Sequence, residues 1–119
     1  KSIDGLQQLP KLMGPSSSEQ AVMQQYQVIN QILYPLGARI RELSLNERGA
    51  WTMMLTNGVE VRLGKDKVLA RLRRLVVFLG SDYGSAMGEI AAIDLRYRNG
   101  IAVTPRSDDD VGIEEVVTL

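Results

Sequence analysis

Two Asn-Gly pairs, each set within a run of alternating apolar residues, constrain the fold of this chain more than any other feature. Asn57-Gly58 lies in the middle of the alternating segment 51–63, and Asn99-Gly100 lies in the segment 93–103. Glycine reaches positive φ without a Cβ clash, and asparagine tolerates it better than most residues. Each pair therefore predicts a β-hairpin, and the chain must contain antiparallel strands.

The alternation of side chains predicts the register of both hairpins. In the second hairpin, a three-residue loop over 98–100 pairs Tyr97 with Ile101 and Leu95 with Val103, with the last loop glycine left-handed. One face then carries Ile93, Leu95, Tyr97, Ile101 and Val103. A two-residue loop would mix charged and apolar side chains on both faces. The same argument predicts a three-residue loop, Thr56-Asn57-Gly58, in the first hairpin, with one face formed by Trp51, Met53, Leu55, Val59, Val61 and Leu63.

The strand that ends the second hairpin is expected to be an edge of the sheet. Pro105 closes it, and proline has no N–H for a ladder, so it fits an edge strand or the end of a strand. An unpaired edge over Ile101 to Val103 can accept a strand from a partner, or from a second copy of the chain.

The remaining elements follow from capping and periodicity. An extended segment over 6–14 precedes Ser16-x-x-Glu19, whose spacing matches a capping box and predicts a helix over about 17–34 that stops at Pro35 and Gly37. A strand with a bulge is expected within 39–46, because its apolar spacing changes from three to two. Asp66 can cap a second helix over about 67–79, with a buried stripe of Val68, Leu69, Leu72, Leu75, Val76 and Leu79.

This order predicts an α+β fold: a largely antiparallel or mixed β-sheet with two helices packed on it and a terminal hairpin, about 89–104, providing the edge. At 119 residues and 45% hydrophobic content, we expect one domain over 1–105. Residues 106–119 carry a net charge of −4, against +4 for the rest, and are expected to form a flexible acidic tail whose last residues could still form a short strand.

The composition excludes several kinds of chemistry. The chain has no Cys and no His, which removes disulfides, thiolate catalysis and the commonest bases and transition-metal ligands. No cofactor and no metal are expected, and no basic strand with interleaved aromatics supports nucleic-acid binding. No segment is long and apolar enough to cross a bilayer, so we expect a soluble chain, whose start at Lys1 is compatible with a targeting segment upstream.

Two chemical alternatives stay open at this point. The loop Gly64 to Lys67 lies between a strand and a helix, and with the cationic helix over 67–79 it could bind an anion or a small ligand, although it lacks the second glycine and Ser/Thr of a P-loop. Asp94 could act as an acid or base, but an exposed ion pair with Arg96, two residues along the same strand face, is the favoured interpretation. We therefore expect a protein that is not an enzyme.

Five ordered segments resemble the C-terminal β domain of the FtsQ/DivIB family of bacterial cell-division proteins. They are Leu9-Pro10-x-Leu12-x-Gly14-Pro15, Arg48-Gly49-Ala50-Trp51-x-x-x-Leu55-x-Asn57-Gly58, Leu63-Gly64-Lys65, Arg71-Leu72-x-Arg74 and Asp94-Leu95-Arg96-Tyr97-x-Asn99-Gly100-x-Ala102-Val103. The resemblance covers roughly residues 6–104. It implies a divisome scaffold domain on the periplasmic side of the inner membrane, at the division septum, with a single-pass anchor outside this segment.

The resemblance also implies a partner and a site. In that family the β domain recruits FtsB, with FtsL, when a segment of FtsB adds as a strand to the last strand of the sheet. Matched by motif, the implied partner-binding residues here are Arg48, Arg96, Tyr97, Asn99, Gly100, Ile101, Ala102 and Val103. Arg48 and Arg96 fall where arginines meet an acidic residue of the partner. Some relatives carry a tryptophan shortly after the Ala-Val pair, where this chain has Thr104-Pro105.

Overall fold

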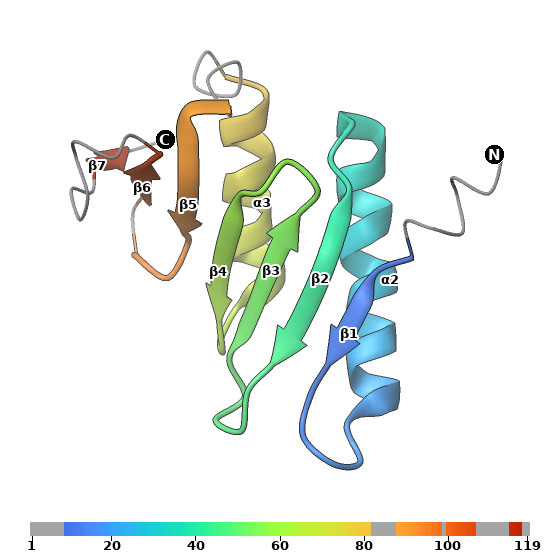
Figure 1. The fold of residues 1–119 in the computed structure, drawn as a ribbon. Helices are drawn as coiled ribbons and strands as arrows, with labels where there is room; N and C mark the ends of the chain where they lie inside the picture. Colours follow the sequence, from blue (N-terminus) through green and yellow to red (C-terminus); the bar gives the residue numbers. More distant parts are fainter. Residues whose placement is uncertain (1–8, 82–87, 99, 107–114, 118–119) are drawn as a thin grey trace, which may run out of the picture.

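A computed structural model describes residues 9–81, 88–98, 100–106 and 115–117 of the chain. The described residues form one mixed sheet of seven strands, in the order β1 to β7, with two α-helices (Figure 1). The strands are β1 (Lys11–Met13), β2 (Ile40–Leu45), β3 (Trp51–Leu55), β4 (Glu60–Gly64), β5 (Ile90–Asp94), β6 (Ile101–Pro105) and β7 (Glu115–Val117). The helices are α2 (Glu19–Leu33), α3 (Val68–Leu79) and the short 3-10 helix η1 (Tyr34–Leu36). The predicted α+β class is confirmed.

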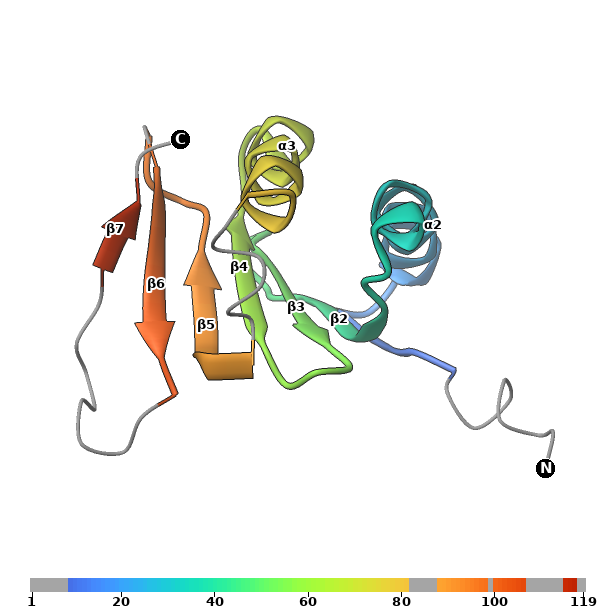
Figure 2. The ribbon, with the colours of Figure 1, turned by 90° about the horizontal axis from the view of Figure 1, so that it is seen from above.

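Both helices lie on the same face of the sheet, as the view from above shows (Figure 2). Helix α2 packs against β1 and β2, and α3 packs against β4. The strand pairs β1–β2 and β4–β5 are parallel, and the other neighbouring pairs are antiparallel. Apolar residues of the helices and of the covered sheet face form a single core. Its largest fully buried side chains include Ile29, Leu43, Met53, Leu72, Phe78, Ile93 and Ile101.

The first hairpin has the predicted register from Thr52 to Arg62, and a register shift before Thr52 places Trp51 opposite Gly64 instead of Leu63. Met53 pairs with Val61, and the N–H of Leu55 donates to the carbonyl of Val59 at 2.9 Å, which leaves a loop of three residues. Gly58, the last of them, has φ of 91°, in the left-handed region. The predicted irregularity in β2 is also present, as a register shift between Ile40 and Glu42.

The predicted register of the second hairpin is wrong. Val103 pairs with Ile93, and Ala102 with Asp94, so the connection between β5 and β6 runs from 95 to 100 instead of over three residues. The chain leaves β5 at Leu95, whose N–H donates to the carbonyl of Arg62 on β4 at 2.9 Å. Tyr97, which was expected on the apolar face, is 43% exposed.

The prediction that β6 is the outermost strand is also wrong. Strand β7 pairs antiparallel with β6, with Val117 opposite Ile101, Val116 opposite Ala102 and Glu115 opposite Val103. Three residues of the segment predicted as a flexible tail therefore extend the sheet, in line with the alternative that its end could form a short strand.

Both helices begin differently from the prediction. Ser18, not Ser16, is the N-cap of α2, and its hydroxyl donates to the carbonyl of Pro15 at 2.5 Å instead of capping the helix. Lys67, with φ of 54°, precedes α3 where Asp66 was expected as the cap. The buried face of α3 comprises Val68, Leu72, Leu75 and Phe78. Leu69, placed in the stripe by prediction, is exposed because it lies on the side of α3 away from the sheet.

The first-hairpin turn gives a stability prediction. Gly58→Ala should lower the free energy of unfolding by about 1 kcal/mol, because an L-residue is strained at this positive φ. A Cβ at Gly58 would also lie 3.4 Å from the guanidinium of Arg106. Urea denaturation at equilibrium measures the change.

The matched control is Gly88→Ala, because a Cβ at Gly88 would meet nothing within 4 Å. Equal effects of the two substitutions would contradict the left-handed turn.

Candidate functional site

The candidate site is the outer side of β6 together with the 95–100 loop that leads into it. Ile101, Ala102 and Val103, three of the residues implied by the resemblance, form the part of β6 that pairs with β7 and are buried. Ile101 and Val103 belong to the core, whereas Ala102 alternates to the opposite face and is only 1% exposed. One backbone edge of β6 pairs with β5, and the opposite, outer edge pairs with β7. The backbone edge of β6 therefore takes an antiparallel strand in this structure.

An arginine of α3 fixes the 95–100 loop. The guanidinium of Arg74 donates from one nitrogen to the carbonyl of Gly100 at 2.8 Å and to the carbonyl of Tyr97. Tyr97 thus has its backbone held while its side chain stays partly exposed beside Asp94 and Arg96, with which it lines a shallow hollow. Asn99, also implied as a contact residue, lies outside the described residues.

Asp94 organises a charged cluster at the end of β5. Its carboxylate accepts a hydrogen bond from the backbone N–H of Arg96 at 3.0 Å and two from the Arg96 guanidinium, at 2.9 Å and 2.7 Å. Arg62, its register partner on β4, lies 3.9 Å away and also pairs with Glu60 at 2.9 Å. The predicted ion pair between Asp94 and Arg96 is therefore confirmed, but its predicted exposure is wrong for Asp94, which is buried.

The ionisation of Asp94 follows from these contacts. The residue is 4% exposed, and this burial acts to raise its pKa. Hydrogen bonds from the side chain and backbone of Arg96, with the charges of Arg96 and Arg62, outweigh the burial, so the pKa of Asp94 lies below its ordinary value. Asp94 is a fixed carboxylate that closes a turn, and a carboxylate with a lowered pKa is a poor general acid at neutral pH.

Arg48 lies apart from the other implied residues in sequence but at the same end of the sheet. It sits in the exposed turn between β2 and β3, where its backbone N–H donates to the side chain of Asn46 at 2.9 Å. A Cβ on the adjacent Gly49 would lie 3.8 Å from the side chain of Lys65, and a Cβ on Gly64 would meet the side chain of Arg96. Figure 1 shows β2 and β5 both pointing downward, so the β2–β3 turn and the loop after β5 each follow the lower end of a strand, the loop after β5 lying higher in the view.

Two of the cations invoked by the anion-binding alternative donate hydrogen bonds to backbone carbonyls. Arg71 donates to the carbonyl of Leu63 at 2.8 Å, and Arg74 holds the 95–100 loop. Both guanidinium groups thus stabilise the connections around β4 and β6. The predicted Gly64 to Lys67 loop does lead into α3, but its bend uses left-handed conformations at Gly64 and Lys67 and not the glycine-rich turn of a phosphate loop.

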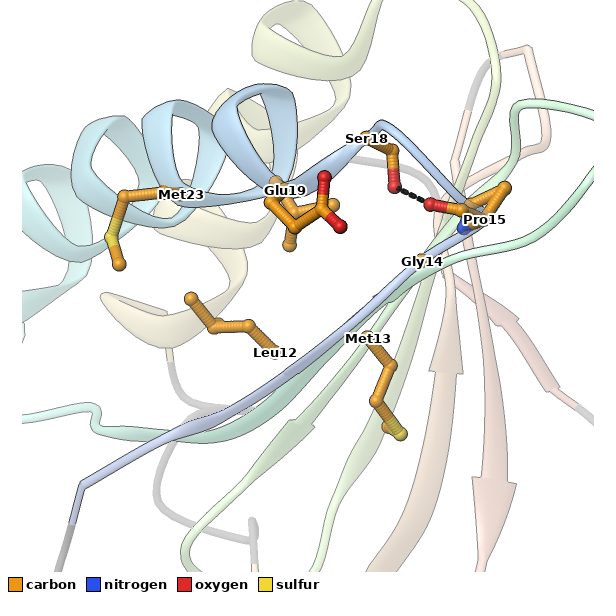
Figure 3. Close-up of a pocket in the computed structure, with 8 residues that line it drawn as sticks. Leu12, Met13, Gly14, Pro15, Ser18, Glu19 and Met23 are labelled. Carbon is orange, nitrogen blue, oxygen red and sulfur yellow. Dashed lines mark hydrogen bonds between the residues drawn. The ribbon is translucent and has the colours of Figure 1, made fainter.

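A second hollow lies at the other end of the strand order, between β1 and the start of α2 (Figure 3). Leu12 and Met13 from β1 and Val22 and Met23 from α2 supply its apolar lining, and Glu19 supplies a carboxylate. Its wall is braced by the hydrogen bond from Ser18 to Pro15, drawn as a dashed line (Figure 3). This hollow contains none of the residues that the sequence implied.

Sequence reasoning missed the anchoring roles of two arginines, and it predicted a strand at the end of the tail only as an alternative. Arg74 and Arg106 anchor the two ends of β6, the latter by donating to the carbonyl of Ile90 at 2.6 Å. Each contact joins residues far apart in the chain, so no local spacing indicates it. For β7, the adjacent β-branched residues Val116 and Val117 were the available signal.

The fold and the site define a small α+β sheet domain that pairs strands through the backbone edge of β6. Among the described residues there is no group of three or more His, Cys, Asp or Glu that could hold a metal ion. In the same part of the chain, no helix is long and apolar enough to cross a membrane.

Comparison with known proteins shows the family. The profile of the cell division protein FtsQ/DivIB C-terminal family matches residues 1–96, and the chain belongs to this family. The chain is 40% identical over 103 residues to the cell division protein FtsQ of Cellvibrio japonicus, covering 87% of this chain and 32% of that protein. It is 38% identical over 96 residues to FtsQ of Acinetobacter oleivorans, covering 81% and 34%. The chain thus spans about a third of the length of these curated relatives.

The Asp94 cluster gives a prediction about pH. Asp94→Asn should lower the free energy of unfolding at pH 7 by about 1 to 2 kcal/mol, because a charge-assisted interaction is lost, moderated by the partial exposure of Arg96 and Arg62. A lowered native pKa stabilises the fold above the ordinary pKa of 3.8, and this contribution disappears as pH falls through the native value. The difference between the variant and the natural chain should therefore shrink as the pH falls below 3.8.

Urea denaturation at a series of pH values tests this. Glu60→Gln, which removes a carboxylate from a more exposed ion pair, is the control and should change stability by less than about 0.5 kcal/mol. A loss in Asp94→Asn that stays constant from pH 7 down to the lowest pH at which the chain is folded would contradict the role given to its charge.

Proposed function

We propose that this chain is the non-catalytic interaction domain of a divisome protein, which recruits FtsB together with FtsL by adding a strand of FtsB to β6. Membership of the FtsQ/DivIB C-terminal family supports the divisome role. The single observation that carries the mechanism is the antiparallel pairing on the outer side of β6, over Ile101 to Val103. An edge that accepts one antiparallel strand has the backbone geometry to accept another.

The surroundings of β6 suit this mode of binding. Main-chain hydrogen bonds supply affinity in strand addition, and neighbouring side chains supply specificity. Tyr97 offers a partly exposed aromatic side chain on a loop that Arg74 holds in place. Large amphipathic side chains on a fixed backbone bind with little loss of conformational entropy, which makes Tyr97 the best candidate for an anchor.

The two arginines would serve the charged part of the contact. Arg96 is held by Asp94 yet has a side chain that is 56% exposed, and Arg48 is exposed on a turn at the same end of the sheet. An acidic residue of the partner would meet them at the rim of the interface, where charge pairs chiefly affect the association rate and its dependence on salt. In the assembled cell envelope, we place the domain on the periplasmic side of the inner membrane, at the septum.

The proposed function predicts the effect of one exposed side chain. Tyr97→Ala should weaken binding of the purified periplasmic FtsB–FtsL complex by about tenfold or more, because truncation removes an aromatic anchor beside the added strand. Isothermal titration calorimetry measures the dissociation constant. The substitution should leave the fold intact, since the Tyr97 side chain is substantially exposed.

Tyr34→Ala is the matched control, because Tyr34 is a second exposed tyrosine, 56% exposed, in η1 at the end of α2. Its substitution should leave the dissociation constant within about twofold. Equal weakening by both substitutions, or by neither, would argue against docking at the β6 edge.

A further inference from the structure

The edge that the proposed function requires is covered by the chain itself. Strand β7 lies along β6 with its three residues in antiparallel register, opposite Ile101, Ala102 and Val103. These are the residues over which we propose that a partner strand pairs. A second strand cannot use the same N–H and C=O groups, so β7 and an incoming strand exclude each other.

The structure describes three residue pairs between β6 and β7. In the described residues it covers Ile101 to Val103 of β6, while Thr104 and Pro105 pair with Ala92 and Ile90 of β5 on the other side. A strand of three residues contributes few ladder hydrogen bonds, and each is worth little net of its exchange with water. A longer strand from a partner can therefore replace β7 at this edge.

The connection between the two strands favours β7 in the absence of a partner. Only nine residues, 106–114, separate Pro105 from the start of β7. A short tether gives its end a high effective concentration at the edge, on the order of millimolar. The backbone and side chain of Arg106, which donate to the carbonyls of Glu89 and Ile90, fix the point from which this tether departs.

The tail also has a composition that suits a sheet edge rimmed by arginines. The sequence of the tether and the start of β7 contains five acidic residues: Asp108, Asp109, Asp110, Glu114 and Glu115. The register then places the β-branched residues Val116 and Val117 opposite Ala102 and Ile101. An acidic segment followed by β-formers matches what a basic-rimmed sheet edge binds from another chain.

We infer that β7 is a built-in competitor: the C-terminal strand of this chain occupies the β6 edge, and a partner strand binds by displacing it. This inference rests on the proposed function. The affinity for a partner then depends on the fraction of molecules in which β7 is not paired with β6. If β7 is paired in about nine molecules of ten, the apparent dissociation constant is about tenfold larger than that of the open edge.

The test disables β7 in the full chain. The double variant Val116→Pro, Val117→Pro removes backbone N–H groups at two successive positions, so it disrupts β7 whichever of them faces β6. The matched control, Val116→Ile, Val117→Ile, keeps both N–H groups and the β-branched character. A peptide from the C-terminal part of FtsB is titrated into the natural chain and both variants, with amide exchange in β3 and β4 reporting that the fold is intact.

We expect the proline variant to bind the FtsB peptide about tenfold more tightly than the natural chain, and the isoleucine control to bind like the natural chain. Equal affinity for all three proteins would overturn the inference and leave the proposed function standing.

A peptide that binds none of the three would contradict the proposed function instead. A second probe then decides the inference, namely a synthetic peptide of residues 111–119 added to the proline variant. Saturable shifts of the amides of Ile101 to Val103 would support a strand-docking edge that the tail occupies, and no shifts at millimolar peptide would overturn it.

Discussion

The carboxylate of Asp94 determines where β5 ends, and the position of β6 depends on it. By accepting the backbone N–H of Arg96 as well as its guanidinium, Asp94 turns the chain out of the sheet one residue after the strand. The N–H of Leu95 then donates to the carbonyl of Arg62 on β4, and the guanidinium of Arg74 on α3 donates to the carbonyl of Gly100 in the loop. Together these contacts deliver β6 in register beside β5, with its outer edge facing away from the rest of the sheet.

Local patterns were enough to predict most of the fold. The alternation from Trp51 to Leu63 admits only one loop length at Asn57-Gly58, and the structure has that loop because nothing distant competes with it. The same argument failed at Asn99-Gly100. There the hydrogen bond from Leu95, just after β5, to Arg62 of β4 joins residues far apart in the chain, and it outweighs the local preference for a three-residue turn. The face was still right for Ile93, Leu95, Ile101 and Val103, because the shift of register preserved the alternation.

Local patterns also predicted part of the candidate site, and contacts between distant residues limited that prediction. The apolar alternation and Pro105 identified Ile101 to Val103 as a strand near the end of the sheet, whereas the arginines that hold it, Arg74 and Arg106, act across 26 and 16 residues of sequence. That β7 pairs with the outer edge of β6 was harder to predict from the sequence. An acidic composition favours a solvated tail, and only Val116 and Val117 pointed toward a strand. The end of the tail forms a strand because the backbone edge of β6 lies close to the start of its tether. This proximity comes from the fold and not from the composition of the tail.

The central claim is that the β6 edge is the place where a partner strand adds, with β7 as the occupant it replaces. Backbone nuclear Overhauser effects between β6 and an isotope-labelled FtsB segment test it most directly. The account predicts cross-strand contacts from the FtsB segment to Ile101, Ala102 and Val103, and the simultaneous loss of the contacts between these residues and β7. A segment that binds while the β6–β7 contacts persist would contradict it, because the partner would then be using another surface.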